Sequence, residues 1–177
     1  MNTAAREMSK DDILKYLSAL NDKLNSKNVQ GEISIVGGAV MCLCFESRLS
    51  TIDIDSVFKP QDEIEILILE IAKDHGLPAT WLNDICYQFL SDEGEFVLYQ
   101  SFSNLKIYTA SAEYMLAMKC MSGRMYNQNE VDDIEFLVKY LKIKNSGEVA
   151  QIMKKYYPEE DVKMSVSTFI KDILNEH

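Results

Sequence analysis

Asp53 and Asp55, which are separated by one residue, have the types and spacing in this chain best suited to chemistry. Alternate side chains of an extended strand point to the same face, so both carboxylates would project together while Ile52 and Ile54 hold the strand in the core. Adjacent carboxylates repel each other and call for a cation or a shared proton. The best candidate is a hard divalent cation, Mg²⁺ or Mn²⁺, which prefers oxygen ligands.

The segments before and around these aspartates predict a strand, a short helix and a second strand. Residues 32–36 form an apolar run that ends at Gly37-Gly38. Residues 39–46 have a helical pattern, and residues 51–58 again suit a strand. The glycines and the aspartates would therefore lie at the ends of neighbouring elements.

The rest of the chain predicts an α+β fold with a change of character near residue 110. A helix is expected at residues 10–27, and further strands only up to residue 109. Residues 1–110 are therefore predicted to form an α/β core with an N-terminal helix. Residues 111–177 should form a C-terminal helical subdomain, or bundle, packed on that core.

Length and composition suit one globular domain, or one domain with a helical extension. The chain has 177 residues, of which 47% are apolar, enough for a core. No apolar run approaches the roughly 18–20 residues needed to span a bilayer. The polar N-terminal sequence lacks the apolar region of a signal peptide. We expect a cytoplasmic protein with no membrane partner and with four reduced, buried cysteines.

The net charge of −10 argues against a surface that grips nucleic acid over a wide area. It leaves open a local basic patch. It also leaves open an acidic site that holds a metal and lets the metal meet phosphates.

The pattern Gly-Gly, helix, Arg-x-x-Thr-x-Asp-x-Asp resembles the nucleotidyltransferase superfamily, which has the polymerase beta-like fold. The later blocks ASAEYMLAMKCMSGR and DDIEFLVKYL resemble the second half of small bacterial nucleotidyltransferases of the abortive-infection and toxin type, and of their uncharacterised relatives. The resemblance covers roughly residues 33–157. It implies a small mixed sheet flanked by helices.

The resemblance also implies roles for particular residues. Asp53 and Asp55 would be catalytic and would bind Mg²⁺ or Mn²⁺, which bridges the phosphates of a nucleoside triphosphate. The residues implied in nucleotide binding are Gly37, Gly38, Arg48, Thr51, Lys119 and Arg124. The glycines would let backbone amides at a helix N-terminus approach phosphate, with Thr51 or Ser50 adding a hydroxyl. Lys119 or Arg124 would neutralise the leaving pyrophosphate, with Asp132 or Asp133 orienting the cation.

The implied activity is Mg²⁺-dependent transfer of a nucleoside monophosphate from a nucleoside triphosphate to an acceptor hydroxyl. The acceptor could be RNA, a protein or a small molecule, as in a toxin–antitoxin-like system. One departure from the family concerns a third carboxylate on a later strand. The strand expected at residues 105–109 carries Lys106 and Tyr108 in its place, and Asp84 or Glu95 could substitute.

Three alternatives therefore remain: a site that works with two carboxylates, a nucleotide-binding or regulatory module without transfer, and a protein whose main partner is a cognate protein that docks on the C-terminal helices.

The candidate site residues also have plainer structural explanations. The aspartates could be solvated acids at a strand edge, the glycines an ordinary turn, and Arg48 a surface ion pair. Lys119 could extend along an apolar face. The segment Trp81–Asp84 could line the site, or Trp81 could simply pack in the core.

Overall fold

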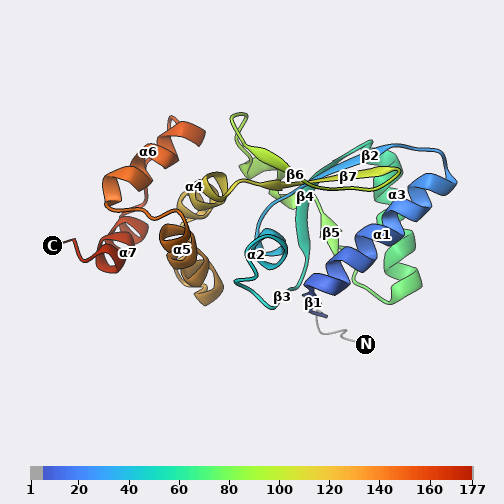
Figure 1. The fold of residues 1–177 in the computed structure, drawn as a ribbon, viewed down its shortest axis with the longest axis horizontal. Helices are drawn as coiled ribbons and strands as arrows, with labels where there is room; N and C mark the ends of the chain where they lie inside the picture. The colour runs from blue at the N-terminus through green and yellow to red at the C-terminus, as the bar shows by residue number, and fades with distance from the viewer. Residues whose placement is uncertain (1–5, 177) are drawn as a thin grey trace. The chain divides into compact units, whose positions relative to one another are not determined.

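The computed structural model describes residues 6–176 and divides the chain into two compact units (Figure 1). The first comprises Met1–Gln88 and Phe96–Ala110, and the second comprises Phe89–Glu95 and Ser111–His177. Strands and helices mix in the first unit, whereas the second contains helices α4 to α7. The predicted α+β class is confirmed.

Within residues 6–176, the first unit contains a mixed five-stranded sheet with the strand order β5-β4-β2-β7-β6. Its strands are β2 (Gly31–Ile35), β4 (Ile54–Lys59), β5 (Leu82–Asn83), β6 (Phe96–Ser101) and β7 (Leu105–Ala110). Strand β2 is antiparallel to β4 and parallel to β7. A short second sheet pairs β1 (Met8–Ser9) with β3 (Ser50–Thr51). Strand β2 is therefore the central strand, with β4 and β7 as its neighbours.

One face of the sheet is covered by helices α1 (Lys10–Ser26) and α3 (Gln61–His75). A Cβ atom on Gly31 would lie 2.9 Å from Leu24 Cδ1 of α1 and 3.3 Å from Ile64 Cδ1 of α3. Side chains that point to this face are buried: Ile33, Ile35, Ile54, Phe58, Leu105 and Ile107. Side chains of the opposite face, such as Ser34 and Val57, are half-buried. The sheet thus has one packed face and one more open face.

Local signals in the sequence set the ends of these helices. Ser9 and Asp12 form a capping box at the start of α1. Helix α3 ends at Gly76, whose φ of 65° and ψ of 36° are left-handed. Between strand β2 and the aspartates lies α2 (Gly38–Leu43), with only 6 residues.

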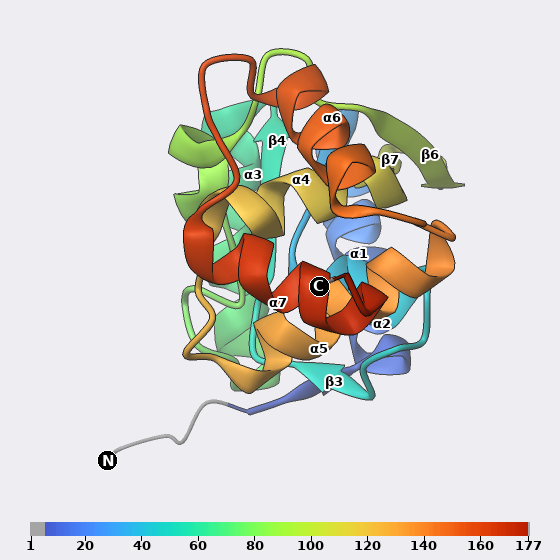
Figure 2. The same ribbon diagram turned by 90° about the vertical axis from the view of Figure 1, so that its left-hand side faces the viewer.

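The second unit consists of α4 (Ala112–Ser122), α5 (Gln128–Tyr140), α6 (Ser146–Tyr156) and α7 (Met164–Leu174) together with residues 89–95 (Figure 2). The Tyr114 hydroxyl of α4 accepts a hydrogen bond of 2.8 Å from Ser91 N. Its ring lies 5.0 Å from the ring of Tyr156, and a Cβ on Gly94 would be 2.7 Å from Tyr114 Cε1. Residues 89–95, which precede the predicted boundary at 110, therefore fold with the helices.

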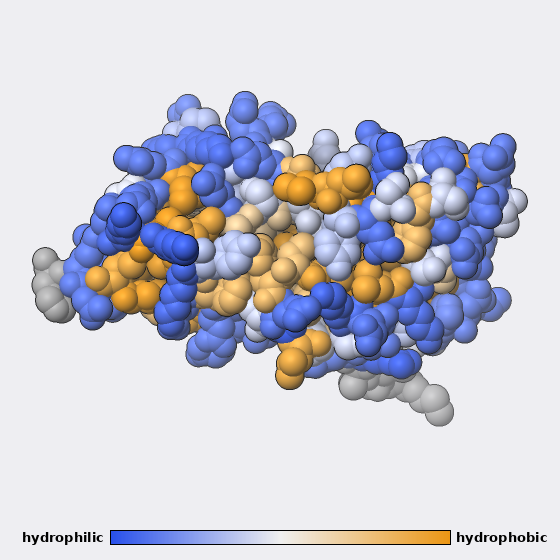
Figure 3. Space-filling view, viewed as in Figure 1, coloured by the Kyte–Doolittle hydropathy of each residue, from blue (hydrophilic) through white to orange (hydrophobic). Residues whose placement is uncertain are grey.

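The surface of the second unit includes large side chains that are strongly exposed, at 88% for Tyr126 and 85% for Met164. Figure 3 shows apolar colour over part of the C-terminal helices. None of the helices formed by residues 6–176 is long and apolar enough to cross a membrane.

The four cysteines are free, as expected, but one prediction about them was wrong. Cys42, Cys86 and Cys120 are buried, whereas Cys44 is exposed. Cys44 follows the last residue of α2, so it lies outside the helical stripe that packs in the core.

Candidate functional site

The Gly37–Gly38 turn lies directly against three of the predicted site residues. Gly37 has φ 69° and ψ −150°, a conformation that is essentially restricted to glycine. A Cβ on Gly37 would lie 3.0 Å from Asp55 Oδ2. A Cβ on Gly38 would lie 2.8 Å from Thr51 Oγ1 and 2.9 Å from Arg48 Nη1. The structure thus brings together five residues that the sequence singled out, and the three side chains can approach the turn this closely because the glycines carry no side chain.

Asp53 and Asp55 flank the first residue of β4. Asp53 precedes the strand, Ile54 is fully buried, and both aspartates are half-buried. Strand alternation favours carboxylates on one side, but Asp53 lies outside β4, so the shared side stays a prediction. The expectation that Ile52 packs in the core was wrong, because Ile52 is 54% exposed. The chain does not form one continuous strand at 51–58; it leaves β3 at Thr51 and enters β4 at Ile54.

Asp53 is held by two neighbouring side chains. The Thr51 hydroxyl donates a hydrogen bond of 3.2 Å to the backbone oxygen of Asp53. Asn83 Nδ2 lies 3.5 Å from Asp53 Oδ2, a long hydrogen bond. Burial raises the pKa of Asp53, and the contact with Asn83 offsets only part of that effect. A cation beside Asp53 would stabilise the charged form of its carboxylate. The hydrogen bond from Thr51 holds the backbone of Asp53 in place.

Asn83 is the site neighbour that the sequence only hinted at, through the unusual segment Trp81–Asp84. Strand β5 pairs with β4 so that Asn83 lies opposite Asp55. The Asn83 amide is fixed because its Oδ1 accepts from Ile85 N at 3.1 Å. Trp81 is also buried, as predicted for a core residue. No local pattern could reveal the pairing of a two-residue strand with β4.

Cys86 lies close enough to the carboxylates to be affected by their charge. Burial, followed by the charge of Asp55, raises the pKa of Cys86 to about 12. Its Sγ lies 3.5 Å from the backbone oxygen of Ser56. Burial and the nearby carboxylate charge therefore both disfavour the thiolate form of Cys86.

Strand β7 brings no acid to the face that carries Asp55. The residue pairs Ser34–Val57 and Ser34–Tyr108 lie in one row across β4, β2 and β7. Val57 is two residues from Asp55, so Tyr108 shares its face, and so does Lys106. The strand that the family resemblance associates with a third carboxylate therefore presents a phenol and an ammonium group.

The two acids considered as substitutes already have partners in the structure. Asp84 Oδ2 accepts a hydrogen bond of 2.9 Å from Gln61 Nε2. Glu95 belongs to the second unit, where its Oε1 is 2.8 Å from Lys155 Nζ. Neither arrangement indicates a third carboxylate beside Asp53 and Asp55.

Lys119 and Arg124 belong to the second unit and differ in their surroundings. The Lys119 side chain is 5% exposed, and its Nζ lies 2.7 Å from Asp133 Oδ2 and 3.1 Å from Glu130 Oε1. Arg124 is 55% exposed, with its Nη2 3.7 Å from Glu130 Oε1. The charge of Lys119 is therefore balanced inside the α4–α5 contact, while Arg124 keeps most of its side chain in solvent.

Asp53 and Asp55 suit a metal ion that binds together with a phosphate ligand. They suit a permanently bound structural metal less well. Within residues 6–176, no group of three or more His, Cys, Asp or Glu side chains is placed to hold a metal ion. Magnesium is often held by one or two carboxylates, with substrate phosphates and water completing its octahedron. Asp53 and Asp55 could supply that share of the ligands.

No protein-family model matches the chain, and no curated protein or solved structure matches it significantly. The family resemblance consequently rests on the residues of this chain and on their arrangement.

Proposed function

We propose that this protein is a Mg²⁺-dependent nucleotidyltransferase, with Asp53 and Asp55 as its metal-binding carboxylates. The observation that supports this proposal is the close approach of the Gly37–Gly38 turn to Asp55, Thr51 and Arg48. The turn has no side chains, so its backbone lies beside the Asp55 carboxylate and the Arg48 guanidinium, which could bind a metal ion and a phosphate oxygen, respectively.

Each part of this cluster has a chemical task in the proposal. Asp53 and Asp55 would hold Mg²⁺ or Mn²⁺, which when bound neutralises phosphate charge and stabilises the leaving pyrophosphate. Gly37 and Gly38 would let the backbone approach the phosphates closely. Arg48 would add a permanent positive charge. Helix α2 has only 6 residues, so its dipole adds little.

The acceptor in this proposal is a hydroxyl group of RNA or protein, as in toxin-like relatives of the family. The proposal assigns Lys119 no direct contact with the nucleotide, because Glu130 and Asp133 already balance its charge. Arg124, which is more exposed, remains a candidate phosphate ligand.

Labelled nucleoside triphosphates, incubated with the protein, Mg²⁺ and either total RNA or lysate protein, would test this activity. Transfer of label should require Mg²⁺ and should be lost in Asp53→Asn and Asp55→Asn. Asp62→Asn is the matched control, because Asp62 is an exposed carboxylate in the first turn of α3. Equal labelling by all three variants and the wild type would argue against the proposed site.

The second candidate function is a nucleotide-binding or regulatory module without transfer. Lys106 and Tyr108, at the place associated with a third carboxylate, are the observation that favours it. Calorimetry would separate the two functions. Mg²⁺-dependent binding of a triphosphate without product supports the module, and measurable turnover excludes it.

A cognate protein partner is a further candidate, favoured by exposed side chains of the second unit such as Tyr126 and Met164. Light scattering of the purified protein alone and after co-expression with a neighbouring gene product would reveal a stable complex. A monomer in both samples would count against this candidate.

A further inference from the structure

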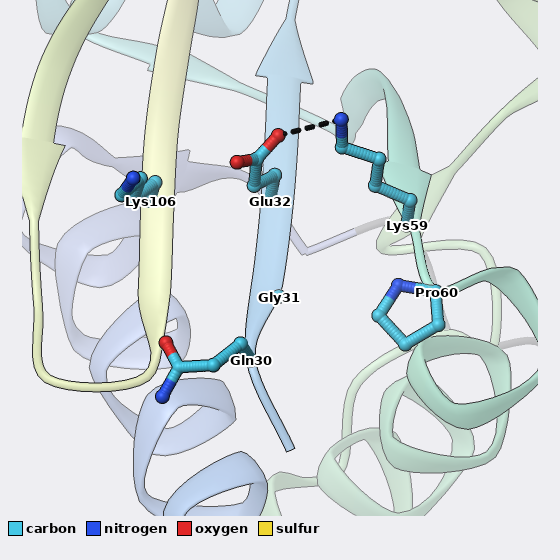
Figure 4. Close-up of a pocket in the computed structure, with 6 residues that line it drawn as sticks. All are labelled: Gln30, Gly31, Glu32, Lys59, Pro60 and Lys106. Carbon is cyan, nitrogen blue, oxygen red and sulfur yellow. Dashed lines mark ion pairs between the residues drawn. The ribbon is translucent and has the colours of Figure 1, made fainter.

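A row of three charged side chains crosses the open face of the sheet at the start of β2. Glu32 on β2 is paired in register with Lys59 on β4 and with Lys106 on β7. Cross-strand neighbours point to the same face, so an acid lies between two lysines. Figure 4 shows Glu32 between Lys106 and Lys59, with the ion pair to Lys59 dashed.

These three residues line a cavity of about 470 Å³ together with Gln30, Gly31 and Pro60 (Figure 4). This volume lies in the range of small-molecule sites. A Cβ on Gly31 would point away from the cavity, toward Leu24 and Ile64 on the packed face. The floor of the cavity at Gly31 is therefore backbone.

The charges in this row do not balance. Lys59 Nζ lies 2.8 Å from Glu32 Oε2, which neutralises one lysine. Lys106 is exposed and makes no ion pair within residues 6–176. One carboxylate between two ammonium groups leaves a net charge of about +1, in a protein whose net charge is −10. The Lys59 side chain is 75% exposed, so its ammonium can turn toward a ligand without losing much packing.

We propose that this cavity binds a phosphate group through Lys59 and Lys106. Lysine is a common phosphate ligand because its ammonium is a compact charge with three donors. The subsite is separate from the aspartate cluster: Lys59 lies four positions after Asp55 on β4, about 13 Å away at 3.3 Å per residue. The side chains between them on this face, including Val57 and Tyr108, are half-buried. An extended phosphorylated ligand could therefore follow the face from one site to the other.

The phosphate could belong to a small molecule or to the backbone of a single-stranded oligonucleotide. Titrations of ¹⁵N-labelled protein with pyrophosphate and with a short single-stranded RNA, at constant ionic strength, distinguish these sources. We expect saturable shifts of the backbone amides of Gln30, Gly31, Lys59 and Lys106. A pyrophosphate response without an RNA response assigns the site to a small molecule. Tighter RNA binding, with shifts that extend to Val57 and Tyr108, assigns it to an oligonucleotide.

Three variants test whether the charges of the row cause the binding. Lys106→Gln should weaken binding about tenfold, because it removes a charge-assisted hydrogen bond to the phosphate. Glu32→Gln should strengthen binding, because it removes the negative charge from the cavity. Lys73→Gln, an exposed lysine in the last turn of α3, makes the same change in net charge and should have no effect.

If the three charged side chains only stabilise the pairing of the strands, the results would differ. In that case, neither ligand gives saturable shifts, or Lys106→Gln and Lys73→Gln change the affinity equally; either result overturns the proposal. Thermal unfolding of each variant verifies that it is folded. Binding at this cavity should persist in Asp53→Asn, so failure of the nucleotidyltransferase proposal would be distinguishable from failure of this one.

Discussion

At the scale of single residues, glycine conformation decides how closely the chain can approach a carboxylate. Gly37 combines a backbone conformation that other residues avoid with a Cβ direction that ends 3.0 Å from Asp55 Oδ2. Gly76 also has a positive φ, of 65°, but a Cβ there would meet nothing within 4 Å. A comparison of the two positions therefore distinguishes the effect of backbone strain, which both share, from the effect of steric crowding, which only Gly37 has.

Gly37→Ala should therefore lower the free energy of unfolding by about 1–3 kcal/mol and also displace Asp55. Urea unfolding and calorimetric titration with a triphosphate and Mg²⁺ would measure both effects. Gly76→Ala should lose about 1–2 kcal/mol and leave binding unchanged. Equal binding by the two variants would show that Asp55 does not depend on the space beside Gly37.

Lys119, predicted as a nucleotide ligand, has contacts that suit a structural role. Its ammonium is enclosed by Asp133 and Glu130 of α5. Removing one member of a buried ion pair leaves an uncompensated charge and is strongly destabilising.

Lys119→Met should thus lower the free energy of unfolding by about 3–5 kcal/mol, as measured by chemical denaturation. The control is Lys139→Met, since Lys139 forms an exposed pair with Glu135 on the same helix. Such pairs contribute about 0.3–0.5 kcal/mol. A loss below about 1 kcal/mol for Lys119→Met would contradict a structural role, because the energies of exposed pairs lie in that range.

At the scale of elements, the best-defined boundary is the start of α1. The Ser9 side chain accepts from Asp12 N at 3.2 Å, and Asp12 Oδ2 accepts from Ser9 N at 3.0 Å. The hydrogen bonds from Ser9 lower the pKa of Asp12 below its usual range. A depressed pKa in the folded state means that this stabilisation is present above the pKa of the unfolded chain. It is lost as the pH falls through the folded value.

Asp12→Asn should accordingly be less stable than the wild type at pH 7, and the difference should shrink as the pH falls below about 4. Urea unfolding at a series of pH values measures this difference. Asp11→Asn, in the same helical turn, controls for the general effect of an acid near the helix N-terminus. A difference for Asp12→Asn that is constant from pH 7 to pH 2.5 would show that the carboxylate charge is not involved.

At the scale of the whole molecule, the division into units does not follow the order of the chain. The chain enters the second unit at Phe89, returns to the first at Phe96 and leaves it again after Ala110. Ser91 and Gly94 depend on Tyr114, which comes later in the sequence.

A fragment of residues 1–110 should keep the sheet but lose order in residues 89–95. Those residues lack their contacts with Tyr114 and Tyr156 in the fragment. Hydrogen exchange of the ¹⁵N-labelled fragment should show protected amides in β2 and β7 and fast exchange at Ser91. Protection of Ser91 equal to that in the full chain would mean that this segment belongs to the sheet unit.

Much of the fold could be predicted because it depends on local patterns. Helical periodicity predicted a helix at residues 10–27, where α1 spans Lys10–Ser26, and the strand expected at residues 105–109 is β7 (Leu105–Ala110). The pair Gly37-Gly38 and the spacing of Asp53 and Asp55 pointed to the candidate site, since these features need only a few neighbours along the chain; their roles stay a prediction. The prediction that Ile52 packs in the core was wrong, because an apolar residue in a short gap between two strands has the same local pattern as a residue inside a strand.

The rest depended on residues that are distant in sequence. Only the pairing of β5 with β4 places Asn83 opposite Asp55, and only the contact of α4 with α5 encloses Lys119 among acids. The same holds for Glu32, which lies between Lys59 and Lys106 because β2 is central in the sheet. Local sequence determines which segments become strands and helices, because backbone conformation responds to nearby side chains. Tertiary structure decides which charges become neighbours, because that depends on strand order and helix packing.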